Sequence, residues 1–241
     1  MRDYKAEFEG RVKWIKRLVE ESGCSGIVFG NSGGKDSALV GILCKAACEN
    51  TLGLIMPCAS RRNYGEDADH GKILADSFGI EARTVDLSDT HAALRSAVGS
   101  AAELNAQALT NLAPRLRMAS LYAVAAAENR LVAGTGNRSE IFMGYFTKWG
   151  DGACDFNPIS DLCAGEVFEF LEYLNAPRCI IDKAPSAGLF DGQTDEADMG
   201  VSYAAIDRYM AGGEVTERER DIIERYHRIS RHKRRPYRTY E

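Results

Sequence analysis

Apolar residues recur at helical spacing over residues 4–21, so the first element that the pattern predicts is an amphipathic helix. Short apolar runs then alternate with longer segments of helical periodicity. The runs predict strands over 26–30, 51–56, 80–86 and 131–134. The intervening segments predict helices over 36–48, 66–78 and 112–129. This alternation indicates an α/β fold, with a mostly parallel sheet flanked by helices on both faces.

The last third of the chain has a less regular pattern. Residues 164–175 predict a helix, and helices resume at about 202–210 and 215–232. Residues 184–200 mix Gly, Pro, Ser, Thr and acids with little apolar period, which predicts a long loop of the kind that closes over a site. With no linker or internal repeat, the 241 residues predict a single domain over 1–241.

Composition narrows the class of protein. Thirty basic and 35 acidic residues give a net charge of −5, which does not indicate a nucleic-acid partner. There is neither a charged and apolar leader nor an apolar run of membrane-spanning length. The seven cysteines are scattered without a Cys-x-x-Cys pair, which favours reduced thiols over disulfides or zinc. We therefore expect a cytoplasmic protein that acts without nucleic acid or membrane.

A glycine-rich run, Ser32-Gly33-Gly34-Lys35-Asp36-Ser37, directly follows the predicted strand 26–30. Two adjacent glycines allow backbone N–H groups to point at an anion, and the following helix N-terminus favours negative charge. The run is not a Walker-type P-loop, because Phe29 and Asp36 occupy positions where that motif needs Gly and Ser or Thr. It matches the S-G-G-x-D-S loop of enzymes that split ATP between the α and β phosphates. The alternative is an ordinary strand-to-helix turn that Asp36 caps.

Three further clusters carry candidate chemistry. Gly134-Thr135-Gly136-Asn137-Arg138-Ser139-Glu140 follows a predicted strand, and Tyr145-Phe146-Thr147-Lys148-Trp149-Gly150-Asp151-Gly152 comes next. Taken alone, the first is as typical of an ordinary strand-to-helix loop capped by Ser139 as of a turn at a ligand site. The alternative for the second is an aromatic edge of the core followed by a Gly-Asp-Gly turn. The third cluster is a basic tail with Arg225, Arg228, Arg231, Lys233, Arg234, Arg235 and Arg238. Such a run is usually a solvated helix face or a nucleic-acid arm.

Taken together, the motifs resemble those of one family. The order S-G-G-x-D-S, R-x-R-M, G-T-x-N-x-x-E, G-Y-F-T-K-x-G-D-G, P-S-A-G-L…Q-T-D-E and H-K-R-R-P resembles that of NAD synthetases, from about residue 10 to 238. Only about 25 residues precede the first predicted strand, so the chain is similar to the short, ammonia-dependent form without a glutaminase domain. The resemblance implies an N-type ATP pyrophosphatase with a Rossmann-like, adenine nucleotide alpha hydrolase-like fold, and a homodimer.

The implied activity is that of a ligase forming a C–N bond. The carboxylate of nicotinic acid adenine dinucleotide (deamido-NAD) attacks the α-phosphate of ATP and releases pyrophosphate. Ammonia then attacks the adenylated carboxylate, giving NAD and AMP. Such chemistry needs positioning and charge neutralisation more than a protein nucleophile. The implied cofactor is Mg²⁺, which prefers carboxylate and phosphate oxygens.

The resemblance also implies roles for individual residues. Asp36 and Glu140 would hold Mg²⁺ and, with Asp151 as a proton acceptor for ammonium, would be the catalytic groups. The ATP-binding residues would be Ser32, Gly33, Gly34, Lys35, Asp36, Ser37, Thr135 and Ser186. Those binding deamido-NAD would be Arg115, Lys148, Asp155, His232 and Lys233.

One position departs from the family pattern. Ala164 stands where a lysine usually contacts the ATP phosphates, which predicts weaker ATP binding unless Lys35 or Lys183 compensates. This departure leaves room for another adenylating amidotransferase or thiolase that uses the same loop. A non-catalytic nucleotide-binding or RNA-binding protein that uses the basic tail is the third possibility.

Overall fold

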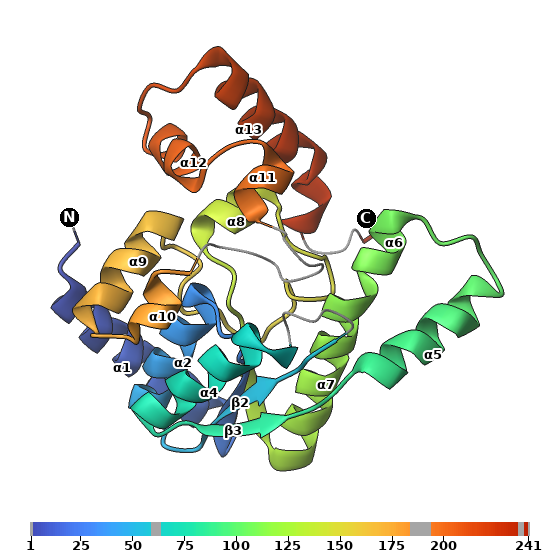
Figure 1. Cartoon of the computed structure of the whole chain (residues 1–241). Helices are drawn as coiled ribbons and strands as arrows, with labels where there is room; N and C mark the ends of the chain where they lie inside the picture. The colour runs from blue at the N-terminus through green and yellow to red at the C-terminus, as the bar shows by residue number, and fades with distance from the viewer. Residues whose placement is uncertain (1, 59–63, 184–193, 236–238, 241) are drawn as a thin grey trace.

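The computed structural model describes residues 2–58, 64–183, 194–235 and 239–240. A sheet of parallel strands in the order β3-β2-β1-β4 lies at its centre (Figure 1). The strands are β1 (Gly26–Gly30), β2 (Thr51–Ile55), β3 (Glu81–Thr84) and β4 (Arg130–Ala133). All four predicted strands are confirmed. The edge strand β3 is shorter than predicted, and its side chains are exposed.

Helices follow the strands as the periodicity predicts. The first set is α1 (Tyr4–Ser22), α2 (Lys35–Ala47), α4 (Glu66–Phe78), α5 (Ser88–Gly99), α6 (Ala106–Thr110), α7 (Leu112–Glu128) and α8 (Arg138–Met143). The second set is α9 (Ala164–Tyr173), α10 (Arg178–Ile181), α11 (Asp195–Met199), α12 (Tyr203–Met210), α13 (Glu217–Ile229) and the 3₁₀ turn η1 (Arg231–Lys233). Among the described residues no helix is long and apolar enough to cross a membrane.

One predicted loop is partly wrong. Residues 184–193 lie outside the described residues, but the end of the predicted loop 184–200 forms α11. Thr194 caps this helix by accepting a hydrogen bond from the backbone N–H of Ala197. Acidic side chains fill its first turn, where the helix dipole favours them. Five residues are too few to show an apolar period, so the pattern did not reveal the helix.

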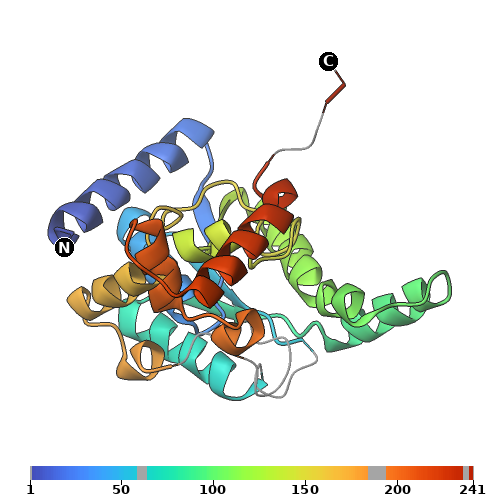
Figure 2. The same cartoon turned by 90° about the horizontal axis from the view of Figure 1, so that it is seen from above.

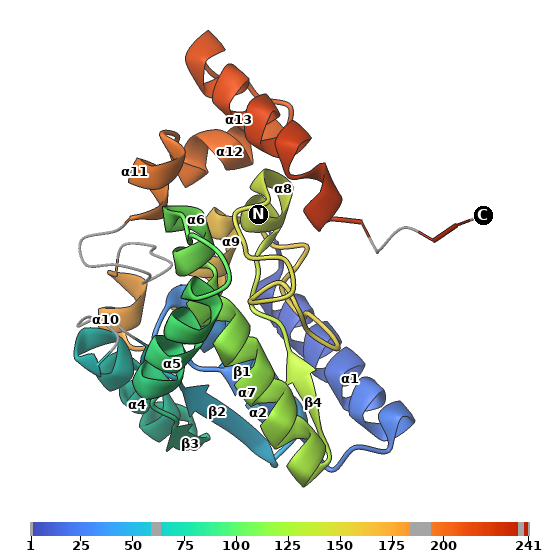
Figure 3. The same ribbon diagram turned by 90° about the vertical axis from the view of Figure 1, so that its right-hand side faces the viewer.

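The two faces of the sheet bury separate clusters. Ile27 and Phe29 pack in one cluster with α1, α2, α4 and α9, whereas Val28, Leu52 and Leu54 pack in the other with α7. Figure 1 shows these helices on opposite sides of the sheet, which confirms the predicted α/β class with both faces covered. The chain from α11 to α13 lies beyond the carboxyl ends of the strands (Figure 3).

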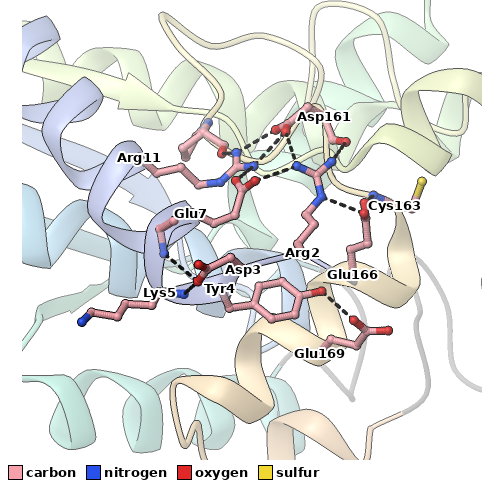
Figure 4. Close-up of polar contacts among 12 residues, drawn as sticks. Arg2, Asp3, Tyr4, Lys5, Glu7, Arg11, Asp161, Cys163, Glu166 and Glu169 are labelled. Carbon is pink, nitrogen blue, oxygen red and sulfur yellow. Dashed lines mark hydrogen bonds and ion pairs between the residues drawn. The ribbon is translucent and has the colours of Figure 1, made fainter.

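The N-terminal helix is joined to α9 by a group of charged side chains (Figure 4). The Arg11 guanidinium donates to Asp161 at 2.7 Å, to Glu7 at 2.7 Å and to the carbonyl of Pro158 at 2.5 Å. Arg2 Nε donates to Glu166 Oε1 at 2.7 Å. These contacts fix the segment that enters α9 from outside the core.

Candidate active site

A cavity of about 1100 Å³ lies at the carboxyl edge of the sheet, where parallel α/β folds usually bind their ligands. The loop between β1 and α2 and the turn after β4 form its floor. Residues 144–154 form one wall, and the tail from 229 to 235 closes another. The glycine loop at 32–37, the segment 134–154 and the tail at 229–235 lie far apart in the sequence but face one space.

The glycine loop has the geometry that an anion-binding turn requires. Gly33 has φ +68°, and a Cβ there would lie 2.2 Å from the carbonyl oxygen of Asp67. Only glycine fits this position. The hydroxyls of Ser32 and Ser37 lie 3.0 Å apart, and no side chain caps the helix that begins at Lys35. The first backbone N–H groups of α2 thus remain available for a phosphate.

Two carboxylates meet beside this helix terminus. Asn137 is fully buried, and its amide nitrogen donates to Asp36 Oδ1 at 3.0 Å. Its side-chain oxygen accepts from the N–H of Glu140, whose Oε2 accepts from the N–H of Asn137 at 2.9 Å. Burial, and then the charge of Asp36, raise the pKa of Glu140 well above its usual range. A cation placed between the two carboxylates would relieve this cost.

This donor set fits Mg²⁺ bound together with a phosphate. Mg²⁺ sites in nucleotide enzymes use one or two carboxylates and complete the coordination with substrate phosphates and water. Asp36 and Glu140 both line the cavity. Within the described ranges there is no group of three or more His, Cys, Asp or Glu side chains arranged for a metal. Two carboxylates would leave coordination positions for phosphate oxygens and water.

The wall opposite the glycine loop carries cations and one carboxylate. Lys148 Nζ donates to the carbonyl of His232 at 2.8 Å, and Lys233 Nζ donates to the carbonyls of Gly144 and Phe146. The carboxyl of Asp151 opens to the cavity and accepts from the N–H of Thr147 at 3.0 Å. Removal of surrounding water by the protein raises its pKa. A carboxyl with a raised pKa is a better proton acceptor.

The structure brings most of the predicted residues to the cavity. Those that line it are Ser32, Gly34, Lys35, Asp36, Ser37, Thr135, Glu140, Lys148, Asp151, His232 and Lys233. Gly33 shapes the loop beneath them, and Ser186 lies outside the described residues. Arg115 and Asp155 are not among the lining residues: Arg115 donates to the carbonyl of Lys148 at 3.5 Å, and Asp155 accepts from the N–H of Val132 and from Tyr122.

Three residues of the site were not selected from the sequence: Arg117 and Asp195 line the cavity, and Asn137 lies buried behind its carboxylates. Asn137 joins the two carboxylates, and Arg117 donates to the carbonyl of Met56 at 3.0 Å. Asp195 is buried and accepts a hydrogen bond from the hydroxyl of Tyr203 at 3.1 Å. Each lies inside a motif that the sequence displays, so a signal existed. Its spacing alone did not say which members of the motif face the ligand.

Ala164 lies outside the cavity lining. It is 1% exposed and belongs to the buried cluster that includes Tyr203 and Met143. Lys183 contacts the glycine loop directly: its ammonium donates to the carbonyl of Gly33 at 3.2 Å and to Asp67 at 2.7 Å. Both predicted substitutes for the missing lysine, Lys35 and Lys183, therefore line the cavity.

A parallel sheet with a phosphate-type glycine loop and paired carboxylates at its carboxyl edge defines a nucleotide-binding α/β enzyme. Comparison with known proteins identifies the kind. The family model for NAD synthase matches residues 7–236. The chain therefore belongs to the NAD synthase family, and it is a ligase that forms a C–N bond.

Individual relatives agree with this assignment. The chain is 45% identical to the NH₃-dependent NAD⁺ synthetase of Carboxydothermus hydrogenoformans, over 97% of this chain and 96% of that protein. Its fold is similar to that of NMN synthetase from Francisella tularensis, with a TM-score of 0.92 and 36% identity over 100% and 99% of the two chains. It is also similar to the NH₃-dependent NAD synthetase from Campylobacter jejuni, with a TM-score of 0.81 and 28% identity over the full length of both.

Proposed function

We propose that this protein uses ATP and ammonia to convert deamido-NAD to NAD, through an adenylated carboxylate, with release of AMP and pyrophosphate. The observation that carries the proposal is the single cavity that joins the glycine loop and the carboxylate pair to the basic wall. Neither the other adenylating enzymes nor a non-catalytic binding protein explains this combination together with the family match.

On the ATP side, the N–H groups at the start of α2 and the hydroxyls of Ser32 and Ser37 would bind the phosphates that leave as pyrophosphate. Asp36 and Glu140 would hold Mg²⁺, which neutralises phosphate charge when bound. Thr135 lies beside them in the cavity. The protein's own part is to fix the α-phosphate in line with the incoming carboxylate.

On the acceptor side, Lys148 and Lys233 would bind the diphosphate of the dinucleotide, and the Phe146 ring would pack against a planar base. The Lys233 ammonium already lies 5.3 Å from the centre of that ring. Asp151 would accept the proton that ammonium loses when it becomes the nucleophile. Its raised pKa suits it to that step.

The direct test is to incubate the protein with ATP, Mg²⁺, ammonium and deamido-NAD, and to measure NAD, AMP and pyrophosphate. Equal amounts of the three products are expected. Glu140→Gln, which keeps the shape of the side chain but removes its charge, serves as the inactive control. Formation of AMP and pyrophosphate without NAD would assign the adenylating step to a different acceptor.

A second acceptor is favoured by one observation. The structural relative with a TM-score of 0.92 is an NMN synthetase, and it covers both chains almost completely. Nicotinic acid mononucleotide carries the same carboxylate without the adenylate half, so the same chemistry would convert it to its amide. Comparing kcat/KM for the two acids decides between them: a higher value for the mononucleotide would replace deamido-NAD as the main substrate.

We also propose that the protein is a cytoplasmic homodimer. Its seven cysteines are free, which fits a reducing compartment. Helix α5 buries none of its residues and projects from the body, and α7 buries only Ala113, Pro114 and Ala125 (Figure 2). A second copy packed on the uncovered side of α7 would bury the alanines that this helix exposes.

A further inference from the structure

One buried cation lies among the carboxylates of the cavity. The side chain of Lys35 is 3% exposed, and its ammonium donates to Asp36 Oδ2 at 2.6 Å. This ion pair with Asp36 is buried, and the charges of Glu140 and Asp195 act on the same ammonium.

Two aromatic rings hold this ammonium in place. The nitrogen lies 5.5 Å from the centre of the Phe168 ring on α9 and 5.6 Å from that of Tyr203 on α12. Both distances are typical of cation–π contacts. Because the nitrogen is fixed by elements from three parts of the chain, it is not a solvated side chain that happens to fold over Asp36.

We propose that the Lys35 ammonium is a resident counter-ion of the metal-binding carboxylates, which it neutralises until a divalent cation takes its place. The proposal rests on the metal role given to Asp36 and Glu140 above. A metal that uses Asp36 must compete with an ammonium 2.6 Å from the same carboxylate and is repelled by its charge. The free protein should therefore bind divalent cations weakly, so that metal enters mainly with ATP.

The test uses Mn²⁺ alone, titrated calorimetrically into the nucleotide-free protein. Lys35→Met replaces the ammonium with an apolar side chain of similar length. It should bind Mn²⁺ about tenfold more tightly than the unmodified protein, because a close buried charge pair is removed. Lys45→Met is the matched control, since that ammonium lies near the other end of α2, outside the cavity, and pairs with Glu49. It should leave the affinity for Mn²⁺ unchanged. Equal or weaker binding by Lys35→Met overturns the proposal.

A second measurement covers the case in which Lys35→Met does not fold. In the ¹⁵N-labelled unmodified protein, the ammonium of a buried lysine gives its own NMR signal. Addition of Mg²⁺ without nucleotide should shift that signal as the contact with Asp36 is lost. Mg²⁺ binding that leaves the signal unmoved would refute displacement. Neither measurement involves NAD formation, so failure of the proposed reaction and failure of this inference give different results.

Discussion

At the scale of single residues, Asn137 explains why two acids can lie together in this cavity. Its side chain bonds to Asp36 and to the N–H of Glu140, and its own N–H bonds to Glu140 Oε2. The pair is thus fixed by one fully buried amide. Hydrogen bonds to the charged form offset part of the like-charge repulsion, and the remainder favours a bound cation.

We therefore expect Asp36→Ala and Glu140→Ala each to lower kcat for NAD formation by about 100-fold or more, because phosphate charge then goes uncompensated. Turnover at saturating Mg²⁺ measures the effect, and circular dichroism checks that each variant is folded. Near-normal turnover of a folded variant would remove that residue from the metal site.

Lys35 and Ala164 are both associated with the buried Tyr203, so we expect a longer side chain at 164 to compete with Lys35 for the same space. Lys35 lies over the Tyr203 ring, and Ala164 belongs to the buried cluster of that same tyrosine. A lysine introduced at 164 would bring a second ammonium into a filled region. Ala164→Lys should therefore cost about 1–3 kcal/mol of unfolding free energy, as overpacking commonly does.

The double variant Lys35→Met/Ala164→Lys should recover the part of that loss that comes from placing two ammonium groups together, and it should bind ATP better than Lys35→Met alone. Chemical denaturation and the KM for ATP test both statements. Strictly additive effects would mean that the two positions do not share one space.

At the scale of elements, charged contacts attach the N-terminal segment and α1 to the start of α9. Partial burial acts to raise the pKa of Asp161 and of Glu166. Hydrogen bonds from Arg11 to Asp161 and from Arg2 to Glu166 outweigh burial and lower both pKa values. A carboxyl whose pKa is lower in the folded protein than in the unfolded chain stabilises the folded protein at pH values above its unfolded pKa. This contribution to stability is lost as the pH falls through the pKa that the carboxyl has in the folded protein.

Arg11→Ala should accordingly lower the unfolding free energy by about 1–3 kcal/mol at neutral pH. Its penalty should shrink as the pH falls below 3.8, the ordinary pKa of the Asp161 carboxyl that Arg11 contacts. Urea unfolding at several pH values measures this. Arg17→Ala, which removes an exposed pair with Glu21, is the control with little expected effect. A penalty independent of pH would mean that Arg11 acts through packing alone.

Elements with a long apolar period could be predicted from the sequence, and those without one could not. The residues that form β1 and β2 are buried almost throughout, which requires a continuous apolar run that the sequence shows. Helix α11 has five residues and an acidic first turn, so no periodicity identifies it. In the site, motif membership located the glycine loop and Glu140. It did not reveal that Asn137 bridges the two carboxylates or that Asp195 lines the cavity, because both depend on packing between distant segments.

At the scale of the whole molecule, the tail returns to the cavity that the sheet creates. Lys233 donates to two carbonyls of the 144–146 segment, and the carbonyl of His232 accepts from Lys148. Removal of residues 231–241 should therefore raise the KM for the acceptor by about tenfold or more and change the KM for ATP less. Steady-state kinetics with each substrate varied in turn tests this. Equal increases in the KM for the acceptor and in the KM for ATP would mean that the tail supports the stability of the fold and does not bind the acceptor.

The proposed dimer is the last consequence of the arrangement. Helix α7 exposes alanines at positions 119, 123, 126 and 127, which recur at helical spacing along one side. Small side chains allow two helices to approach closely, so an arginine there should keep them apart. We expect the unmodified protein to be a dimer by light scattering, and Ala123→Arg to shift it toward monomer. Ala204→Arg, at an exposed alanine of α12, should remain dimeric. A monomeric unmodified protein with full activity would refute the assembly, and a dimeric Ala123→Arg would place its interface on another face.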